Sequence, residues 1–291
     1  HKTEGNYNSN IGMPLSMLTM RNDTEVSVLE MGMSNFGEIE YLSNIAEPDI
    51  AIITNIGSSH MEYLGTRENI CRAKLEVVSG LKKDGILLLN GDEPLLRNRE
   101  ELGDNAFFVG FARDCHFRAQ NVRYFMGNTV FDISYGGKTV ENIKIPTMGK
   151  HNVYAALYAF AVATIAGLDE DAIRIGFLNY TTDGMRQHIY PMGKITVIED
   201  CYNASPESMI AAVDVLETYS RGTKRRSVAV LGDMLELGAD SPALHRSVGA
   251  YLAKKKIDRL YTLGSGGDQI AVGARQNGMS KADITPNHNV K

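Results

Sequence analysis

The sequence predicts an α/β protein: a mostly parallel sheet flanked by helices with an appended antiparallel β segment, followed by a second α/β domain. In the first hundred residues, short apolar runs that end in glycine alternate with helical patterns, which is typical of buried parallel strands and their crossover helices. Residues 107–145 instead alternate apolar and polar side chains and contain the small residues that tight hairpins need. From residue 194, strand-like and helix-like runs alternate again.

The first apolar runs should form the parallel strands. They are residues 25–32, 48–57 and 84–94. In sheets of this kind ligands bind beyond the carboxyl ends of the strands. Three polar side chains stand at or just beyond such ends, namely Glu30, His60 and Asn90. The pattern therefore places candidate functional groups at one edge of the sheet.

The remaining elements follow in order. Residues 149–167 are apolar enough for a helix that is mostly buried. A fresh series then begins, with strands at 194–200, 227–234 and 258–264 and helices from Pro206, from about Ser241 and near Asp268. We place a domain boundary near residues 187–193 and expect a frayed end after Gly278.

Composition excludes several classes of protein. With 291 residues and 43% hydrophobic side chains, the chain can bury two ordinary cores. A net charge of -5 without charge blocks gives no footprint for nucleic acid or an anionic membrane. No apolar stretch is long enough to cross a bilayer, and the first ten residues lack the pattern of a signal peptide. The widely spaced Cys71, Cys115 and Cys201 argue against a disulfide framework or a zinc site, so we expect a protein of the reducing cytoplasm.

Lys74 occupies an unusual position in a predicted helix that begins after Thr66, a suitable N-cap. The apolar stripe of this helix consists of Ile70, Val77, Val78 and Leu81. Lys74 lies within the stripe, four residues after Ile70 and four before Val78. It could lie at the edge of the stripe and extend its ammonium to water. Alternatively, partial burial could lower its pKa and make the neutral amine a nucleophile or a target of carbamylation by carbon dioxide.

Glu30 and His60 have two interpretations each. A lone histidine in a loop can be a hydrogen-bonding surface residue or a metal ligand. A carboxylate at the end of a buried strand needs a partner or a metal. Magnesium prefers carboxylate and phosphate oxygens, and a histidine ligand is less usual for it. The spacing alone leaves a metal site as one hypothesis.

Six segments together resemble the Mur ligases. They are "GNYNSNIGMPLSML", "LEMGMSNFGEIEYL", "TNIGSSHMEYLGTRENICRAKLEVVSGL", "GKHNV", "DCYNASPESM" and "LGDMLELGADSPALH". Their order, from the first residues to about His245, is the order of the family. The patterns "EMG…GEI" and "DCYNASPESM" resemble the branch that joins D-alanyl-D-alanine to UDP-N-acetylmuramoyl-tripeptide.

The resemblance implies an ATP-dependent amide ligase of peptidoglycan synthesis that acts as a monomer in the cytoplasm. The substrate carboxylate would attack the γ-phosphate of ATP, and the incoming amine would displace phosphate from the acyl phosphate. Such chemistry needs Mg²⁺ to neutralise phosphate charge. By similarity, Glu30 and His60 would be magnesium ligands, and Lys74 would be carbamylated, its carbamate holding a second magnesium; these three are the expected catalytic residues.

The resemblance also implies a nucleotide site. Asn152 would contact adenine, Arg186 the ATP phosphates and Asp200 the ribose hydroxyls, with Tyr202 and Asn203 nearby. Taken alone, Asn152 reads as a helix cap, Arg186 as a linker charge and Asp200 as a solvated carboxylate. Ser205 and Pro206 have the pattern of an N-cap and a first helical residue.

Asn6 and Asn8 would contact the UDP-muramoyl substrate, although a Gly/Asn turn is the alternative for Asn6. Three departures from the family pattern are visible. Ala155 replaces a second asparagine near the adenine, and Ser9 replaces the second of two paired asparagines. The glycine-rich phosphate loop of the family is absent, and "GSGGD" at residues 264–268 is a lone turn. No role is assigned to Asp233, Glu236 or His245, which match family positions.

The resemblance divides the chain into residues 1–190, most of a central ATPase domain without its phosphate loop, and residues 191–291, the larger part of a Rossmann-like C-terminal ligase domain. An internal fragment of a longer ligase is therefore expected, and the 291 residues alone should be inactive. Two alternatives stay open: a non-catalytic module that binds nucleotide or muropeptide, and a related ligase of the folylpolyglutamate or cyanophycin type.

Overall fold

The computed structural model describes residues 1–97, 102–125, 127–182 and 184–287. Contacts between Cα atoms divide the chain into two compact units, His1–His116 and Phe117–Lys291, and each is described by itself. This division differs from the predicted boundary near residue 190, which stays a prediction. Within the described residues, no helix has the length and apolarity required to cross a membrane.

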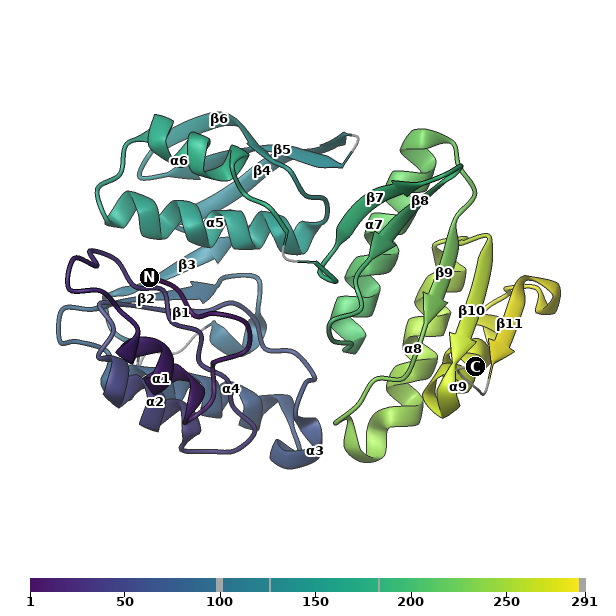
Figure 1. The fold of residues 1–291 in the computed structure, drawn as a ribbon, viewed down its shortest axis with the longest axis horizontal. Coiled ribbons are helices and arrows are strands. Elements are labelled where there is room, and N and C mark those ends of the chain that lie inside the picture. Colours follow the sequence, from purple (N-terminus) through teal and green to yellow (C-terminus); the bar gives the residue numbers. More distant parts are fainter. Residues whose placement is uncertain (98–101, 126, 183, 288–291) are drawn as a thin grey trace. The chain divides into compact units, whose positions relative to one another are not determined.

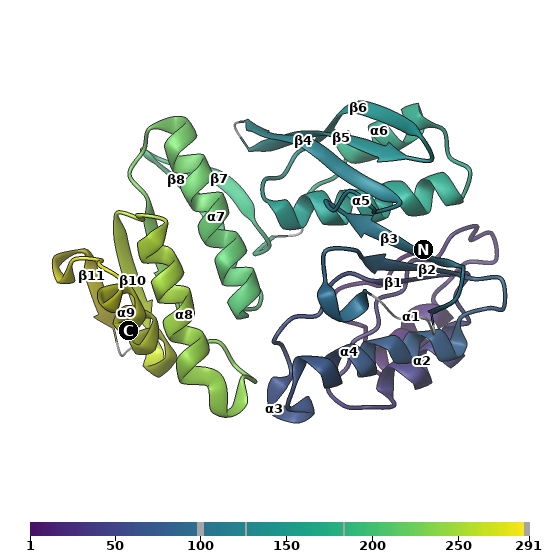
Figure 2. The same cartoon turned by 180° about the vertical axis from the view of Figure 1, so that it is seen from behind.

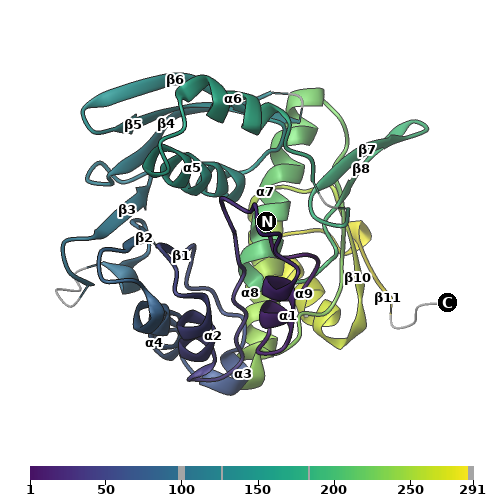
Figure 3. The ribbon, with the colours of Figure 1, turned by 60° about the vertical axis from the view of Figure 1, so that its left-hand side comes forward.

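The first unit is built on three parallel strands, β1 (Ile50–Ile53), β2 (Ile86–Asn90) and β3 (Ala106–Gly110), in that order (Figure 1). Ile50 pairs with Ile86 and Leu87 with Ala106. The helices are α1 (Gly12–Leu18), α2 (Glu38–Ala46), α3 (Met61–Leu64) and α4 (Arg67–Leu75), with short 3₁₀ turns at Glu76–Gly80 and Pro94–Leu96. Helices α2 and α4 lie side by side (Figure 3) and share a core of apolar side chains with β1 and β2.

Two predicted features of this unit are wrong. Residues 25–32 do not form a buried strand: they make an isolated bridge between Val28 and Lys2, and Val28 is 60% exposed. An apolar run becomes a buried strand only where other elements cover it, which the run itself does not reveal. The sequence also predicts an antiparallel segment that begins at residue 107, but residues 106–110 belong to the parallel set, because β3 pairs in parallel with β2.

Helix α4 begins as predicted and ends earlier. The hydroxyl of Thr66 caps it by accepting a hydrogen bond from the N–H of Asn69. Ile70 and Val77 are buried, but the chain tightens into a 3₁₀ turn after Leu75, and Val78 is 41% exposed. Because a 3₁₀ turn has three residues per turn, the apolar stripe does not continue to Val78.

The second unit begins with an antiparallel meander, β4 (Phe117–Phe125), β5 (Asn128–Tyr135) and β6 (Lys138–Ile145). Gly136 and Gly137 form the β5–β6 turn with positive φ angles of 51° and 74°, as a two-residue hairpin requires. Helices α5 (Lys150–Ile165) and α6 (Glu170–Leu178) pack against these strands, as Figure 2 shows from behind. The predicted apolar helix is confirmed, and so is the antiparallel segment from Phe117 onward, although residue 126 lies outside the described residues.

The rest of this unit contains a hairpin and a parallel sheet. Strands β7 (His188–Met192) and β8 (Ile195–Glu199) form an antiparallel two-stranded sheet and pair with no other strand of the described residues. The run at 194–200 is therefore a hairpin strand and not the first strand of a parallel series. Strands β9 (Val228–Leu231), β10 (Arg259–Leu263) and β11 (Ile284–Asn287) are parallel, in the order β11-β10-β9. The helices are α7 (Pro206–Thr223), α8 (Ser241–Lys254) and α9 (Gly264–Gln276).

Strand β11 replaces part of the predicted frayed end, and residues 288–291 lie outside the described residues. Helix α7 begins as predicted: Ser205 forms a capping box with Ser208, and Pro206 occupies the first turn. Helices α7 and α8 run side by side (Figure 2), and Met209 and Val213 of α7 share a core with Val248 and Leu252 of α8.

Candidate functional site

Glu30 and Asn8 are bonded to each other in the first unit. The amide Nδ2 of Asn8 donates to Glu30 Oε1 over 2.8 Å, and the backbone O of Asn8 accepts the N–H of Gly32 over 2.7 Å. A Cβ at Gly32 would stand 2.9 Å from Asn8 Cγ, so the glycine permits this close approach. Asn6 is exposed in the same loop, after Gly5 at a φ of +55°. The loop at residues 5–8 therefore holds the predicted metal ligand Glu30 in place.

Lys74 and His60 are positioned by the segment that follows β1. Lys74 is half-buried, and its Nζ donates to the backbone O of Asn55 over 2.8 Å. His60 precedes α3 in the left-handed region, with a φ of +66°. The ammonium of Lys74 thus points to the carboxyl end of a parallel strand, where the backbone O of Asn55 accepts its hydrogen bond, and this agrees with partial burial.

Glu30 offers the carboxylate oxygens that magnesium prefers, and His60 offers a less usual imidazole ligand. No cluster of three or more His, Cys, Asp or Glu side chains suited to a metal occurs among the described residues. The predicted set assigns Glu30 and His60 to one magnesium and the carbamate of Lys74 to a second, so it does not call for three such side chains in one cluster. A carbamylated Lys74 keeps one N–H, so it could retain the hydrogen bond to Asn55.

The predicted nucleotide residues of the second unit are brought together around Gln187. Nδ2 of Asn152 donates to Gln187 Oε1 over 2.5 Å and to the backbone O of Met148 over 2.7 Å. The backbone N–H of Gln187 donates to Asp200 Oδ1 over 3.2 Å. Asn152, on the first turn of α5, and Asp200, after β8, are therefore linked through one residue. Asp200 is exposed as a residue, but its neighbours crowd the carboxyl group, and this desolvation raises its pKa against the opposing effect of the Gln187 N–H.

Arg186 and Tyr202 stack beside this link. The guanidinium carbon of Arg186 lies 4.1 Å from the centroid of the Tyr202 ring. The backbone O of Met185 accepts the N–H groups of Cys201 and Tyr202, which joins the segment before β7 to the segment after β8. Asn203 is exposed, and its Oδ1 accepts the adjacent N–H of Ala204. The geometry thus associates Arg186 with Tyr202 and gives Asn203 a local bond.

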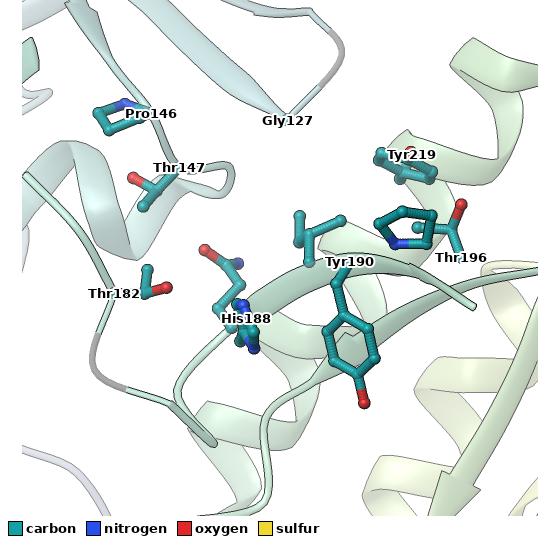
Figure 4. Close-up of a pocket in the computed structure, with 11 residues that line it drawn as sticks. Gly127, Pro146, Thr147, Thr182, His188, Tyr190, Thr196 and Tyr219 are labelled. Atoms are coloured by element: carbon teal, nitrogen blue, oxygen red, sulfur yellow. The ribbon is translucent and has the colours of Figure 1, made fainter.

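A cavity of about 420 Å³ lies beside Gln187, and its lining does not include Asn152, Arg186 or Asp200 (Figure 4). Its walls come from the hairpin β7–β8, from Tyr219 of α7 and from residues at the ends of the antiparallel strands, including Thr147. Gln187 lies in its lining. Its volume falls within the range of small-molecule sites.

The glycine-rich turn at residues 264–268 has a structural explanation. It opens α9, and Oδ1 of Asp233 accepts the N–H of Gly267 over 2.9 Å. A Cβ at Gly264 would stand 2.3 Å from the Asp233 carboxylate, and one at Gly266 would stand 2.2 Å from His245 Nε2. These two glycines admit neighbouring side chains, so their presence needs no phosphate to explain it.

His245 is buried, with an exposed fraction of 1%, and both of its ring nitrogens are bonded. Nε2 accepts the backbone N–H of Met234 over 2.9 Å, and Nδ1 lies 2.7 Å from the backbone O of Ser241. With these partners, Nε2 acts as the acceptor and Nδ1 as the donor. His245 therefore fixes the loop that follows β9.

Gln187 is the functional candidate that the sequence analysis missed. It stands directly after Arg186, and the predicted domain boundary began at this residue. Its left-handed backbone, with a φ of +49°, and its bond to Asn152, 35 positions away, are not visible in a sequence pattern. Only the adjacency to Arg186 could have drawn attention to it.

Comparison with known proteins gives a consistent result. Residues 1–163 match the family model described as Mur ligase middle domain, and residues 185–289 match the model described as Mur ligase, glutamate ligase domain. UDP-N-acetylmuramoyl-tripeptide–D-alanyl-D-alanine ligase of Bacillus subtilis (strain 168) is 44% identical over 94% of this chain and 59% of its own length. The ligase of the same name from Escherichia coli (strain K12) is 32% identical over 90% of this chain and 58% of its own length.

Solved structures agree. A crystal structure of MurF from Acinetobacter baumannii superposes with a TM-score of 0.89 at 27% identity, covering 99% of this chain and 61% of that chain. MurF ligase from Thermotoga maritima in complex with ADP gives a TM-score of 0.82 at 26% identity, covering 98% of this chain and 69% of that one. The chain thus spans less than two thirds of the length of the curated relatives it resembles.

Proposed function

This chain belongs to the Mur ligase family, and we propose that it acts in the ATP-dependent ligase that joins D-alanyl-D-alanine to UDP-N-acetylmuramoyl-tripeptide in peptidoglycan synthesis. The observation that carries the proposal is the 44% identity, over 94% of the chain, to the Bacillus subtilis enzyme of that name. The proposed enzyme works in the cytoplasm as a monomer, with ATP and Mg²⁺.

The second unit supplies the nucleotide site in this proposal. Asn152 contacts the adenine and Asp200 the ribose hydroxyls, and their link through Gln187 supports a shared ligand. Arg186 reaches the phosphates from its position over the Tyr202 ring, because a planar guanidinium can bond two phosphate oxygens at once. Asn203 shapes the loop that carries Tyr202. These residues orient the nucleotide, which is a large part of phosphoryl-transfer catalysis.

The first unit supplies the phosphoryl-transfer residues. Glu30 and His60, with a carbamate on Lys74, would hold magnesium, which when bound neutralises charge on the transferring phosphoryl group. Asn8 keeps Glu30 oriented through its 2.8 Å hydrogen bond, and the exposed Asn6 is available to the UDP-muramoyl substrate. The placement of Lys74 Nζ against the backbone O of Asn55, just beyond the carboxyl end of β1, supports this role.

A substrate-dependence assay tests the proposal. With the protein encoded by the complete gene, ADP release should require both UDP-N-acetylmuramoyl-tripeptide and D-alanyl-D-alanine. Glutamate, offered as the acceptor with a folate or a tripeptide, should give no ADP. Release that is indifferent to D-alanyl-D-alanine would refute the proposed reaction, and nucleotide binding without any turnover would identify a non-catalytic binding module instead.

A further inference from the structure

The side chain of Gln187 is bonded at one end only. Its exposed fraction is 7%, and Oε1 accepts a hydrogen bond from Asn152 Nδ2. Its Nε2 is buried and has no hydrogen-bond partner among the residues that the structure describes. A buried amide donor without an acceptor is unfavourable, because it has lost its bonds to water and gained none in exchange. An acceptor from a ligand would remove this cost.

The backbone of Gln187 is held by a hydrogen bond, as is the side-chain oxygen Oε1. The residue adopts a left-handed φ of +49°, which a residue with a side chain seldom does, and its N–H is bonded to Asp200. Two hydrogen bonds therefore fix Gln187 between the side chains proposed for the adenine and the ribose. Backbone strain of this kind persists where the surroundings determine it and is frequent at ligand sites.

Gln187 also fixes the orientation of the neighbouring amide. Asn152 Nδ2 has the backbone O of Met148 and Gln187 Oε1 as acceptors, so the amino group is directed by protein atoms. The Oδ1 of Asn152 then remains the acceptor that this side chain can offer to a ligand. A donor from Gln187 and an acceptor from Asn152 complement an adenine edge, which presents a ring-nitrogen acceptor next to an exocyclic amino donor.

We propose that Gln187 contacts the nucleobase directly: its Nε2 donates a hydrogen bond to a ring nitrogen of the adenine, while its Oε1 holds Asn152 in the orientation that accepts the exocyclic amine. This inference rests on the proposed nucleotide site and adds to it a residue that determines base specificity. The cavity of about 420 Å³ that Gln187 lines provides room for a purine ring.

A cycle that combines protein variants with altered ligands tests the contact. Binding of ADP and its 1-deaza, 3-deaza and 7-deaza analogues is measured by calorimetry on the wild type, Gln187→Met and Gln269→Met. Gln269 is the control, because its Oε1 also accepts one hydrogen bond, from Arg246, in a part-buried position on α9. The analogue that lacks the ring nitrogen bonded by Gln187 should bind the wild type and Gln269→Met about five- to tenfold more weakly than ADP. That penalty should vanish in Gln187→Met, which cannot donate.

The outcomes separate the inference from the proposed function. A penalty that persists in Gln187→Met for every analogue would overturn the role of Gln187 while leaving nucleotide binding intact. Absence of ADP binding to the wild type would overturn the nucleotide site itself. If thermal unfolding shows that Gln187→Met does not fold, Gln187→Glu decides, because it keeps an acceptor for Asn152 and lacks the donor. For this variant, adenosine and its deaza analogues replace ADP as ligands. They carry no phosphate, so the new carboxylate does not repel them.

Discussion

Asp233 caps helix α9 through Gly267: the carboxylate Oδ1 accepts the backbone N–H of Gly267 over 2.9 Å. Asp233 follows β9, and Gly267 lies in the first turn of the helix that follows β10, so the bond joins two loops at the carboxyl ends of neighbouring parallel strands. The first N–H groups of a helix lack partners within it and favour a negative charge. The cap therefore stabilises the edge of this sheet.

Replacing Asp233 by alanine should lower the free energy of unfolding by about 1–2 kcal/mol, because the N–H of Gly267 loses its acceptor. Asp233→Asn should cost less than half as much, since its amide oxygen can still accept the bond. Urea denaturation followed by circular dichroism measures both. Equal losses for the two variants would show that the negative charge, and not the hydrogen bond, is what matters.

Gly266→Ala should destabilise the protein by about 1–3 kcal/mol, because the new Cβ would stand 2.2 Å from His245 Nε2. His245 cannot move aside without breaking its bonds to Met234 and Ser241. The matched control is Gly176→Ala on α6, where a Cβ meets no heavy atom within 4 Å, so alanine should stabilise the helix by about 0.5–1 kcal/mol. The same denaturation curves decide, and a shift in the same direction for both variants would contradict the packing argument.

The fold could be predicted where the local sequence pattern also determined which strand or helix each element pairs with or packs against. The runs that became β1 and β2 lie between helices that cover them, and the turn at Gly136 and Gly137 fixes its own hairpin. The run around Val28 has the same composition but acquires only a bridge to Lys2, and β8 pairs with β7 and not with the parallel sheet. Pairing depends on distant segments, which periodicity does not contain.

The residues of the candidate site could likewise be predicted only where a local pattern or a family motif marks them. The apolar stripe of a helix drew attention to Lys74, and family motifs identified Asn152 and Asp200, which the structure connects. The connecting Gln187 was missed because its importance lies in a left-handed backbone and a contact between residues far apart in sequence. Such features arise from packing and leave no spacing pattern.

Cys115 should resist alkylation in the native protein. Burial and the nearby charge of Asp92 raise the pKa of its thiol from 9.0 to about 11, so only about one thiol in a thousand is ionised at pH 8. Cys201 is exposed and should react first with iodoacetamide, as mass spectrometry of tryptic peptides would show. Rapid labelling of Cys115 at pH 8 in folded protein would contradict the burial.

The same shift predicts that stability falls in alkaline solution. Because the folded-state pKa of Cys115 lies above the unfolded value, the unfolded chain releases this proton first as the pH rises. The contribution of Cys115 to stability is therefore complete below about pH 9 and declines between about pH 9 and 11. Cys115→Ser, whose hydroxyl does not ionise in this range, should show a smaller decline in the free energy of unfolding over the same pH interval.

Lys74→Gln should reduce the rate of the proposed ligase by about 100-fold or more, because an amide cannot be carbamylated and a carbamate would help to hold the metal. Lys82→Gln is the matched control: Lys82 is half-exposed, its bond to Asp49 lies at the surface, and such pairs contribute little. Carbamate forms from the neutral amine and dissolved carbon dioxide. Removing the carbon dioxide should therefore slow the wild-type enzyme, and adding bicarbonate should restore the rate. A wild-type rate that ignores carbon dioxide, together with an inactive Lys74→Gln, would assign Lys74 a role as an unmodified amine that holds the carbonyl of Asn55 at the end of β1.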